Sequence, residues 1–219
     1  MSDITVHHLN RSRSTRILWM LEELELPYTL KVYKRNPKTM RAPPELAEVH
    51  PLGRAPVVSV GEQVLAESGA ILEHFADSHP TLRPTDPAAL QEYRFWLHYA
   101  EGSLMPPLLV RLILNRLRTT KLPFLIKPVA KGIADKIDAN FSTPAIQQHF
   151  AFIEAHLAEN AWFAGDEFTA ADIQMSYPVA AGLPRAGLTT PTPAIAAWLA
   201  KIEARPAHQR AIEKGGPVA

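Results

Sequence analysis

Polar side chains gather where the first strand of the chain gives way to its first helix. Asn10, Ser12 and Ser14 separate an apolar segment, 4–9, from residues 15–26, in which apolar side chains recur at helical spacing. A helix N-terminus carries a partial positive charge and unpaired N–H groups, so an anion or a thiolate is stabilised beside it. The cluster therefore indicates either such a site or, as the alternative, a serine that only caps the helix.

Two further segments place reactive groups at the edge of a strand. In HPLGRAPV, residues 50–57, Pro56 directly precedes a strand. A proline at that position cannot donate a ladder hydrogen bond and can follow a cis peptide, which exposes the preceding backbone to a ligand. Glu67 and Ser68 put a carboxylate and a hydroxyl between a strand and a helix. An ordinary turn and a plain helix cap are the respective alternatives.

The elements that must position these residues change character along the chain. The predicted strands and helices of the first third are, in order, a strand at 4–9, a helix at 15–26, a strand at 29–33, a hairpin of 57–60 with 63–66, and a helix from 68 to about 79. Strand signals end at the proline-bearing segment 83–87, and the helical patterns that follow are 88–117, 125–138, 144–159, 170–181 and 193–203. We expect a mixed α/β domain at 1–82, a linker at 83–87 and an all-helical domain at 88–219. Pro106 and Pro107 should kink the first long helix.

Composition excludes several kinds of chemistry. The chain has 219 residues and no cysteine, so it holds no disulfide, no thiolate zinc site and no cysteine nucleophile. A net charge of +1 predicts no dominant electrostatic partner. The nine histidines show no metal-ligand spacing, and His7 and His8, adjacent on a strand, should point to opposite faces, so no metal is expected. The first residues lack the basic and apolar regions of a secretory signal, and a cytoplasmic protein is the default expectation.

Taken together, these segments resemble the glutathione S-transferase superfamily, in particular its theta-like bacterial and fungal branch. The matching pieces are HHLNRSRSTRILWMLEELELPY, HPLGRAPV, LAESGAILEH and FTAADI, and the resemblance covers nearly the whole chain. It implies a thioredoxin-like domain of order βαβ-α-ββα that binds glutathione as co-substrate. It also implies an all-helical domain with an apolar site for a second substrate, and a homodimer.

The resemblance assigns roles to the first cluster. Ser12 lies four residues before Arg16, which is the placement of the catalytic serine in theta-like members. Its hydroxyl would donate a hydrogen bond to the glutathione sulfur and lower the pKa of the thiol. Arg11 and Arg13 flank this serine and the usual proline is absent, which leaves Ser14 and Asn10 as rival donors. No tyrosine occupies the end of the strand, so the tyrosine-type mechanism is excluded.

The same resemblance assigns the glutathione contacts. Arg54 would bind a glutathione carboxylate, since a guanidinium suits that bidentate partner. Ala55, before a cis-Pro56, would pair through its backbone with the cysteinyl part of the peptide. Glu67 would meet the γ-glutamyl ammonium and Ser68 the neighbouring carboxylate. His50 stands where asparagine is more frequent, and it either supports the loop or contacts the ligand.

The helical half carries weaker signals. The apolar substrate site could be lined by Tyr99, Met105, Leu109 and Leu112, although such spacing is equally typical of core. Glu101 could reach glutathione across a dimer, but a solvated or interface role is favoured. Thr169 to Asp172 forms a capping box and is interpreted as a folding element. The segment 102–134 has six basic residues and no acid, and we interpret it as a buried helix with a basic outer face rather than a membrane or nucleic-acid surface.

The leading functional hypothesis is a cytoplasmic glutathione transferase for detoxification, conjugating the glutathione thiolate to small hydrophobic electrophiles. Reduction of peroxides or disulfides by glutathione on the same fold is one alternative. A binding module that kept the fold and lost turnover is another. No nucleic-acid, membrane or metal partner is expected.

Overall fold

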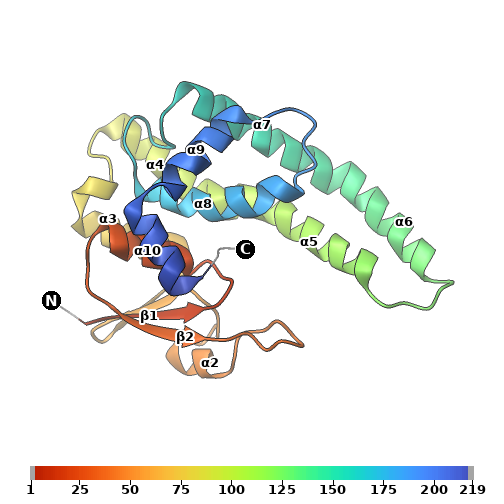
Figure 1. Cartoon of the computed structure of the whole chain (residues 1–219), viewed down its shortest axis with the longest axis horizontal. Coiled ribbons are helices and arrows are strands. Elements are labelled where there is room, and N and C mark those ends of the chain that lie inside the picture. The colour runs from red at the N-terminus through yellow and green to blue at the C-terminus, as the bar shows by residue number, and fades with distance from the viewer. Residues whose placement is uncertain (1–2, 217–219) are drawn as a thin grey trace.

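A four-stranded mixed sheet forms the base of the first domain (Figure 1). The computed structural model describes residues 3–216. The strands are β1 (Ile4–Leu9), β2 (Thr29–Tyr33), β3 (Val57–Val60) and β4 (Gln63–Ala66), in the spatial order β2-β1-β3-β4. β1 pairs parallel to β2 and antiparallel to β3, so Val6 lies between Leu30 and Val58. All four strands have the predicted bounds, and the thioredoxin-like fold is confirmed.

Three α-helices accompany this sheet: α1 (Thr15–Glu23), α2 (Glu45–Val49) and α3 (Ser68–Ser78), followed by a short 3-10 turn, Pro80–Leu82. Their sequences explain their bounds. In α1, Ile17, Leu18 and Leu21 are fully buried, and burial of such side chains contributes about 1.5–3 kcal/mol each. Leu24 and the left-handed Glu25 (φ 52°) end α1 three residues earlier than the predicted 26, before Pro27.

The second domain is helical throughout the described residues that follow Leu82. Its α-helices are α4 (Pro87–Tyr99), α5 (Met105–Thr119), α6 (Lys127–Ile137), α7 (Thr143–Glu159), α8 (Ala170–Gly182), α9 (Pro193–Glu203) and α10 (Pro206–Gly215). Asp86 starts α4 by accepting from the N–H groups of Ala88 and Ala89, both at 3.0 Å, with Pro87 in the first turn.

A π-helical turn lies where the first long helix approaches its two prolines. The predicted helix at 88–117 runs from α4 through this turn, Ala100–Leu104, into α5, and the residues at both junctions keep helical dihedrals. Pro106 and Pro107 follow the turn, after Met105. A proline has no N–H and clashes with the carbonyl four residues earlier, and a π turn is one local adjustment by which a helix accommodates it. A second π turn, Asp138–Ser142, joins α6 to α7 in the same way ahead of Pro144.

The sequence patterns did not predict α10, which brings the chain back onto the first domain. α10 packs beside α1, which is coloured near the red end of the bar in Figure 1, and it lies away from the α5–α6 hairpin. A side chain at Gly215 would lie 2.6 Å from Leu18 and 3.1 Å from the His8 ring, so glycine permits this close approach. One continuous buried core therefore spans both domains.

The α5–α6 hairpin extends away from the rest of the molecule as an arm (Figure 1). The expectation of a buried helix with a basic outer face is wrong here. Arg111 is buried, where its Nε lies 3.0 Å from Asp138, whereas Leu112 and Ile113 are more than half exposed. The helix turns its Arg111 face inward because Asp138, Thr143 and two carbonyls satisfy the guanidinium there. Within residues 3–216, no helix is long and apolar enough to span a bilayer.

Candidate active site

Three of the residues singled out in the sequence line one cavity of about 570 Å³. Ser12 comes from the loop after β1, Arg54 and Ala55 come from the segment before β3, and Tyr177 of α8 closes the cavity from the helical domain. The remaining lining residues are Leu9, Arg13, Arg35, Arg41, Ala42, Leu52 and Gly53. The cavity therefore lies between the two domains, next to the N-terminus of α1.

Asn10 anchors the loop that carries Ser12. Its side-chain oxygen accepts from the Arg35 N–H (2.8 Å), its carbonyl accepts from Arg35 Nε (3.2 Å), and its N–H donates to the Tyr33 carbonyl (3.1 Å). The next residue, Arg11, adopts a positive φ of 50°, which turns the chain toward α1. Asn10 thus ties the end of β1 to the segment after β2, and it does not line the cavity.

The two serines form a buried hydrogen-bonded chain that ends at His8. Ser12 Oγ lies 2.7 Å from Ser14 Oγ, which lies 2.9 Å from His8 Nδ1. Ser14 Oγ also accepts from the Leu9 N–H at 3.3 Å, and Ser14 is fully buried. Burial lowers the pKa of His8, which favours the neutral imidazole. Ser14 therefore stabilises the loop from within, and Ser12 is the serine of the pair that lines the cavity.

The segment before β3 has the predicted backbone. The Ala55–Pro56 peptide is cis. Gly53 has a φ of 56° and lies against Ala47, a combination that suits glycine. His50 Nδ1 accepts from the Leu52 N–H (3.3 Å), and the His50 carbonyl accepts from the Gly53 N–H (2.8 Å). His50 thus supports the loop and does not line the cavity.

Glu67 and Ser68 lie at the N-terminus of α3, outside the lining of this cavity. Glu67 has a φ of 69°, an unusual conformation for a residue with a side chain, which typically persists where the surroundings or a function require it. Ser68 is buried, and its Oγ accepts from Arg16 Nη2 at 2.9 Å. Because that contact occupies only a lone pair, the Ser68 hydroxyl keeps its own proton for another acceptor.

Arg16 joins the two domains beside this site. Its fully buried guanidinium donates to the Gln174 carbonyl (2.6 Å), to Ser68 Oγ (2.9 Å) and to Glu101 Oε1 (2.7 Å). The other carboxylate oxygen of Glu101 lies 3.4 Å from Arg13. Glu101 is thus paired within its own chain, which adds a contact that the sequence did not indicate.

The structure places the four predicted substrate residues away from Ser12. Tyr99 is buried, its hydroxyl lies 2.5 Å from His149 Nδ1, and burial raises its pKa. Met105, Leu109 and Leu112 lie on α5, and the last two are about half exposed (50% and 51%). None of the four lines the cavity beside Ser12, where the helical domain instead contributes Tyr177. The sequence reasoning missed Tyr177, Arg35 and Arg41; no spacing signal marked them.

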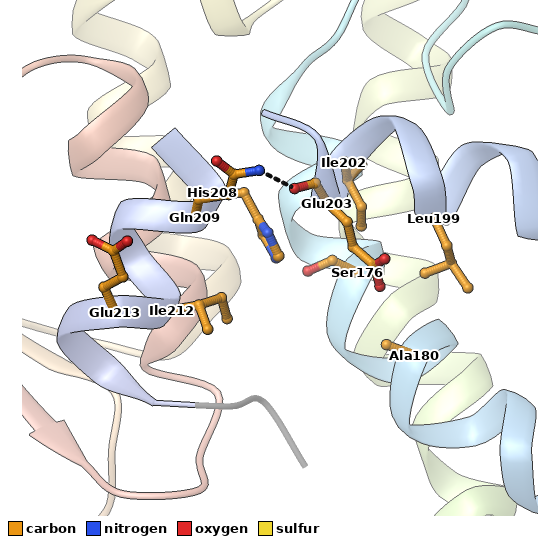
Figure 2. Close-up of a pocket in the computed structure, with 9 residues that line it drawn as sticks. All are labelled: Ser176, Ala180, Leu199, Ile202, Glu203, His208, Gln209, Ile212 and Glu213. Carbon is orange, nitrogen blue, oxygen red and sulfur yellow. Dashed lines mark hydrogen bonds between the residues drawn. The ribbon is translucent and has the colours of Figure 1, made fainter. Parts of the chain in front are cut away.

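A second cavity, of about 590 Å³, lies between α8, α9 and α10 (Figure 2). Its wall is mostly apolar, with Ser176 and Glu203 among the polar residues. Gln209 Nε2 donates to the Glu203 carbonyl at 3.2 Å across the turn between α9 and α10. His208 packs edge-on against Trp19 (4.8 Å between ring centroids), and burial lowers its pKa. None of the residues predicted from the sequence lines this cavity, so it is separate from the Ser12 site.

Two protein-family models match the chain. Residues 11–78 match the glutathione S-transferase N-terminal domain, and residues 114–206 match the C-terminal domain. Glutathione S-transferase 3 of Schizosaccharomyces pombe is 38% identical over 214 residues, covering 96% of this chain and 87% of the relative. The chain belongs to the glutathione S-transferase family.

Further relatives and solved structures agree with this membership. Glutathione S-transferase 1 of Saccharomyces cerevisiae is 37% identical over 223 residues, covering 96% of this chain and 94% of the relative. A glutathione S-transferase from Actinobacillus pleuropneumoniae, 33% identical, superposes with a TM-score of 0.78 over 97% of this chain and 92% of that one. The theta-class enzyme of Xanthomonas axonopodis, solved with glutathione bound, is 23% identical and shares the fold (TM-score 0.73; 99% and 100% covered). These relatives support a glutathione transferase function, with glutathione as co-substrate.

Proposed function

We propose that this member of the glutathione S-transferase family conjugates the glutathione thiolate to small hydrophobic electrophiles, with Ser12 as the residue that stabilises the thiolate. One observation carries the proposal. Ser12 is far in the sequence from Arg54 and Ala55, yet all three line a single cavity at the N-terminus of α1. A hydroxyl, a guanidinium and a backbone amide are the groups that a thiolate peptide with free carboxylates needs.

In the proposed mechanism Ser12 shifts the ionisation of the glutathione thiol. Its O–H donates to the sulfur, which favours the charged form, and each unit of pKa lowering corresponds to about 1.4 kcal/mol. The partial positive charge at the start of α1 acts in the same direction. The thiol proton passes to solvent, and the thiolate attacks the electrophilic carbon. The carbon–sulfur bond forms as the leaving group departs with its electron pair.

The rest of the glutathione molecule would extend from Ser12 along the first domain. Ala55, ahead of the cis-Pro56, would pair with the cysteinyl backbone, and Arg54 would bind the glycyl carboxylate. Ser68 would donate its free hydroxyl proton to the γ-glutamyl carboxylate, and Glu67 would bind the ammonium group. Arg16, which contacts Ser68 Oγ at 2.9 Å, adds positive charge behind that carboxylate.

The proposed role of Ser12 is tested by replacing it and measuring how the rate of conjugation depends on pH, which reports the ionisation of the glutathione thiol. Conjugation of 1-chloro-2,4-dinitrobenzene is measured from pH 5.5 to 9 for the wild type and Ser12→Ala. We expect kcat/KM at pH 6.5 to fall at least about tenfold, and the pH at which kcat/KM rises to increase by about one unit. A shift of that size corresponds to the free energy of one hydrogen bond to the thiolate. If Ser12→Ala changes neither the rate nor the pH profile, Ser12 is not the donor, and turnover abolished by Ser14→Ala alone would point to Ser14.

Assays with different second substrates distinguish conjugation from the related glutathione-dependent activities. Reduction of a hydroperoxide or a disulfide by glutathione needs the same thiolate, so cumene hydroperoxide and a mixed disulfide of glutathione are assayed beside the halo-arene. Turnover of the halo-arene alone supports conjugation. Glutathione binding by calorimetry without any turnover would instead support a binding module.

We also infer a cytoplasmic homodimer with a role in detoxification, and this rests on family membership. A homodimer has about twice the mass of one 24.3 kDa chain. Sedimentation equilibrium distinguishes the two states directly. A species of monomer mass at micromolar concentration would contradict the dimer.

A further inference from the structure

The wall of the cavity beside Ser12 carries more positive charge than the binding of glutathione alone requires. Four of its eleven lining residues are arginines and none is acidic. The four are Arg13, Arg35, Arg41 and Arg54. A cationic cleft with low-dielectric walls raises the local concentration of anions, so the charge of this wall bears on which molecules enter.

Bound glutathione does not account for all four guanidinium groups. In the proposed binding mode Arg54 takes the glycyl carboxylate, Ser68 the other carboxylate and Ser12 the sulfur. Arg35 has a structural role, since it donates to the carbonyls of Asn10 (3.2 Å), Met40 (3.1 Å) and Arg11 (3.3 Å). Arg13 and Arg41 therefore remain without a glutathione group to bind.

Arg13 lies beside Tyr177, the residue that the helical domain, where the second substrate is expected, contributes to the cavity. It follows Ser12 in the chain, and its guanidinium carbon is 5.7 Å from the centroid of the Tyr177 ring in the helical domain. Its carboxylate neighbour, Glu101, is 3.4 Å away and holds Arg16 more closely at 2.7 Å. The Arg13 side chain is 38% exposed, so its charge remains accessible to a ligand in the cavity.

We propose that the electrophile that this enzyme accepts carries an anionic substituent, a carboxylate in the simplest case, which Arg13 binds while the apolar body of the molecule packs against Tyr177. Arg41, on the same cavity wall, adds to the favourable potential. The inference rests on the proposed transferase function and narrows its substrate class. For a chlorinated nitrobenzoate, the carbon–sulfur bond forms, the carbon–chlorine bond breaks, chloride leaves with the electron pair, and the thiol proton goes to solvent.

A matched pair of acceptors tests this inference. The rates of conjugation of 4-chloro-3,5-dinitrobenzoate and of its neutral amide are each divided by the uncatalysed rate with glutathione. We expect the carboxylate to be favoured roughly tenfold in normalised kcat/KM, the scale of one charge-assisted contact in a partly exposed site. Arg13→Gln should bring this ratio close to one, and Arg13→Lys should retain part of it.

Arg11→Gln is the matched control. It removes the same charge on the other side of Ser12, from an exposed residue that does not line the cavity. Its ratio should equal that of the wild type. Equal changes in both variants would mean that Arg13 acts only through the overall charge of the loop, and would overturn the assignment to Arg13.

Binding measurements keep this inference separable from the proposed function. Calorimetry compares glutathione with the two conjugates, which differ only in carboxylate against amide. Tighter binding of the carboxylate conjugate, lost in Arg13→Gln, supports the inference even without turnover. If glutathione binds but the two conjugates bind equally, or the preference survives Arg13→Gln, this inference fails and the proposed function stands. If glutathione itself does not bind, both fail.

Discussion

The two serines of the loop after β1 differ in what their hydroxyl groups contact. Ser14 Oγ has three partners in the buried interior, His8, Leu9 and Ser12, at 2.9, 3.3 and 2.7 Å. Ser12 Oγ bonds within the loop, to the hydroxyl and the N–H of Ser14, and Ser12 also lines the cavity. A hydroxyl has one proton to donate, and the hydrogen bonds of the Ser14 hydroxyl are all made to neighbouring residues of the fold. Contact with the cavity and support of the loop are therefore divided between residues two positions apart.

This division predicts the effect of Ser14→Ala. The change leaves the His8 ring and the Leu9 N–H without their buried partner, and an unsatisfied buried group costs about 1–3 kcal/mol. We expect the free energy of unfolding, measured with urea at pH 7, to fall by that amount. The kcat/KM of the folded variant should fall less than in Ser12→Ala.

Ser59→Ala is the matched control for Ser14→Ala. Ser59 Oγ lies 3.2 Å from His7 Nε2 in the same sheet, but it is only part-buried and lies away from the cavity. Its loss should cost less than about 1 kcal/mol, because water replaces an exposed partner. Equal losses of stability for the two variants would contradict a special role for Ser14.

At this scale three residues that the sequence singled out lie together. Ser12, Arg54 and Ala55 line one cavity, and turn and strand signals surround them in the sequence, while their roles there stay predictions. Two features could not be predicted, because they depend on contacts between the domains. These are the burial of His8, which favours its neutral imidazole, and the position of Tyr177 at the cavity. The separate supporting role of Asn10 depends on Arg35, 25 residues later.

The start of α8 shows a folding element that sequence reads well. Thr169 and Asp172 form the predicted capping box. Asp172 is fully buried and accepts from the Phe163 N–H (3.1 Å), the Trp198 Nε1–H (3.0 Å) and the Thr169 N–H (3.0 Å). The box is predictable because its donors are local, whereas the bonds to Phe163 and Trp198 join α8 to the preceding loop and to α9.

We predict that Asp172→Asn destabilises the protein although it preserves shape. The Phe163 and Trp198 donors share one carboxylate oxygen, and Thr169 donates to the other. An amide offers one oxygen and turns its NH₂ toward the remaining donors. We expect the free energy of unfolding to fall by about 2–4 kcal/mol in urea at pH 7. The exposed Asp166→Asn is the control and should change it by less than about 0.5 kcal/mol.

Element boundaries followed the sequence where the cause is local and departed from it where it is not. The strands and the starts of the helices at Ser68, Ala170 and Pro193 agree with the patterns. The π turns ahead of α5 and α7 were not predicted, because periodicity shows that a helix continues but does not show how it accommodates a proline. The polar segment that forms α10 has too few apolar residues for its pattern to be recognised.

The whole molecule is joined by contacts between residues far apart in the sequence. Arg16 connects α1 to α8, and α10 returns to lie beside α1 (Figure 1). Glu22 and Glu23 of the first domain bind Arg205, Arg210 and Lys214 near the end of the described chain. Charge patterning within α1 gave no sign of these partners, about 180–190 residues away. The helix α10 thus packs against the first domain as well as the second.

Glu22 makes the docking of α10 onto the first domain dependent on pH. Burial by itself would raise the pKa of its carboxyl, but hydrogen bonds from Lys214 (2.5 Å), Arg210 (2.7 Å) and Tyr28 (2.7 Å) lower it from 4.5 to about 2. A lowered folded-state pKa contributes stability that is present above pH 4.5 and is lost as the pH falls toward 2. The cationic partners are about half exposed, so solvent screening reduces the effect.

Glu22→Gln should therefore weaken the docking of α10 at neutral pH and much less in acid. We expect the free energy of unfolding to fall by about 1–2 kcal/mol at pH 7, with the difference from the wild type shrinking toward zero as the pH approaches 2, where the wild-type carboxyl is itself protonated. Urea titrations at pH 7, 5 and 3 measure this, with the exposed Glu25→Gln as control. A loss that stays constant across these pH values would show that Glu22 acts through packing, because a charge-dependent contact must disappear with the charge.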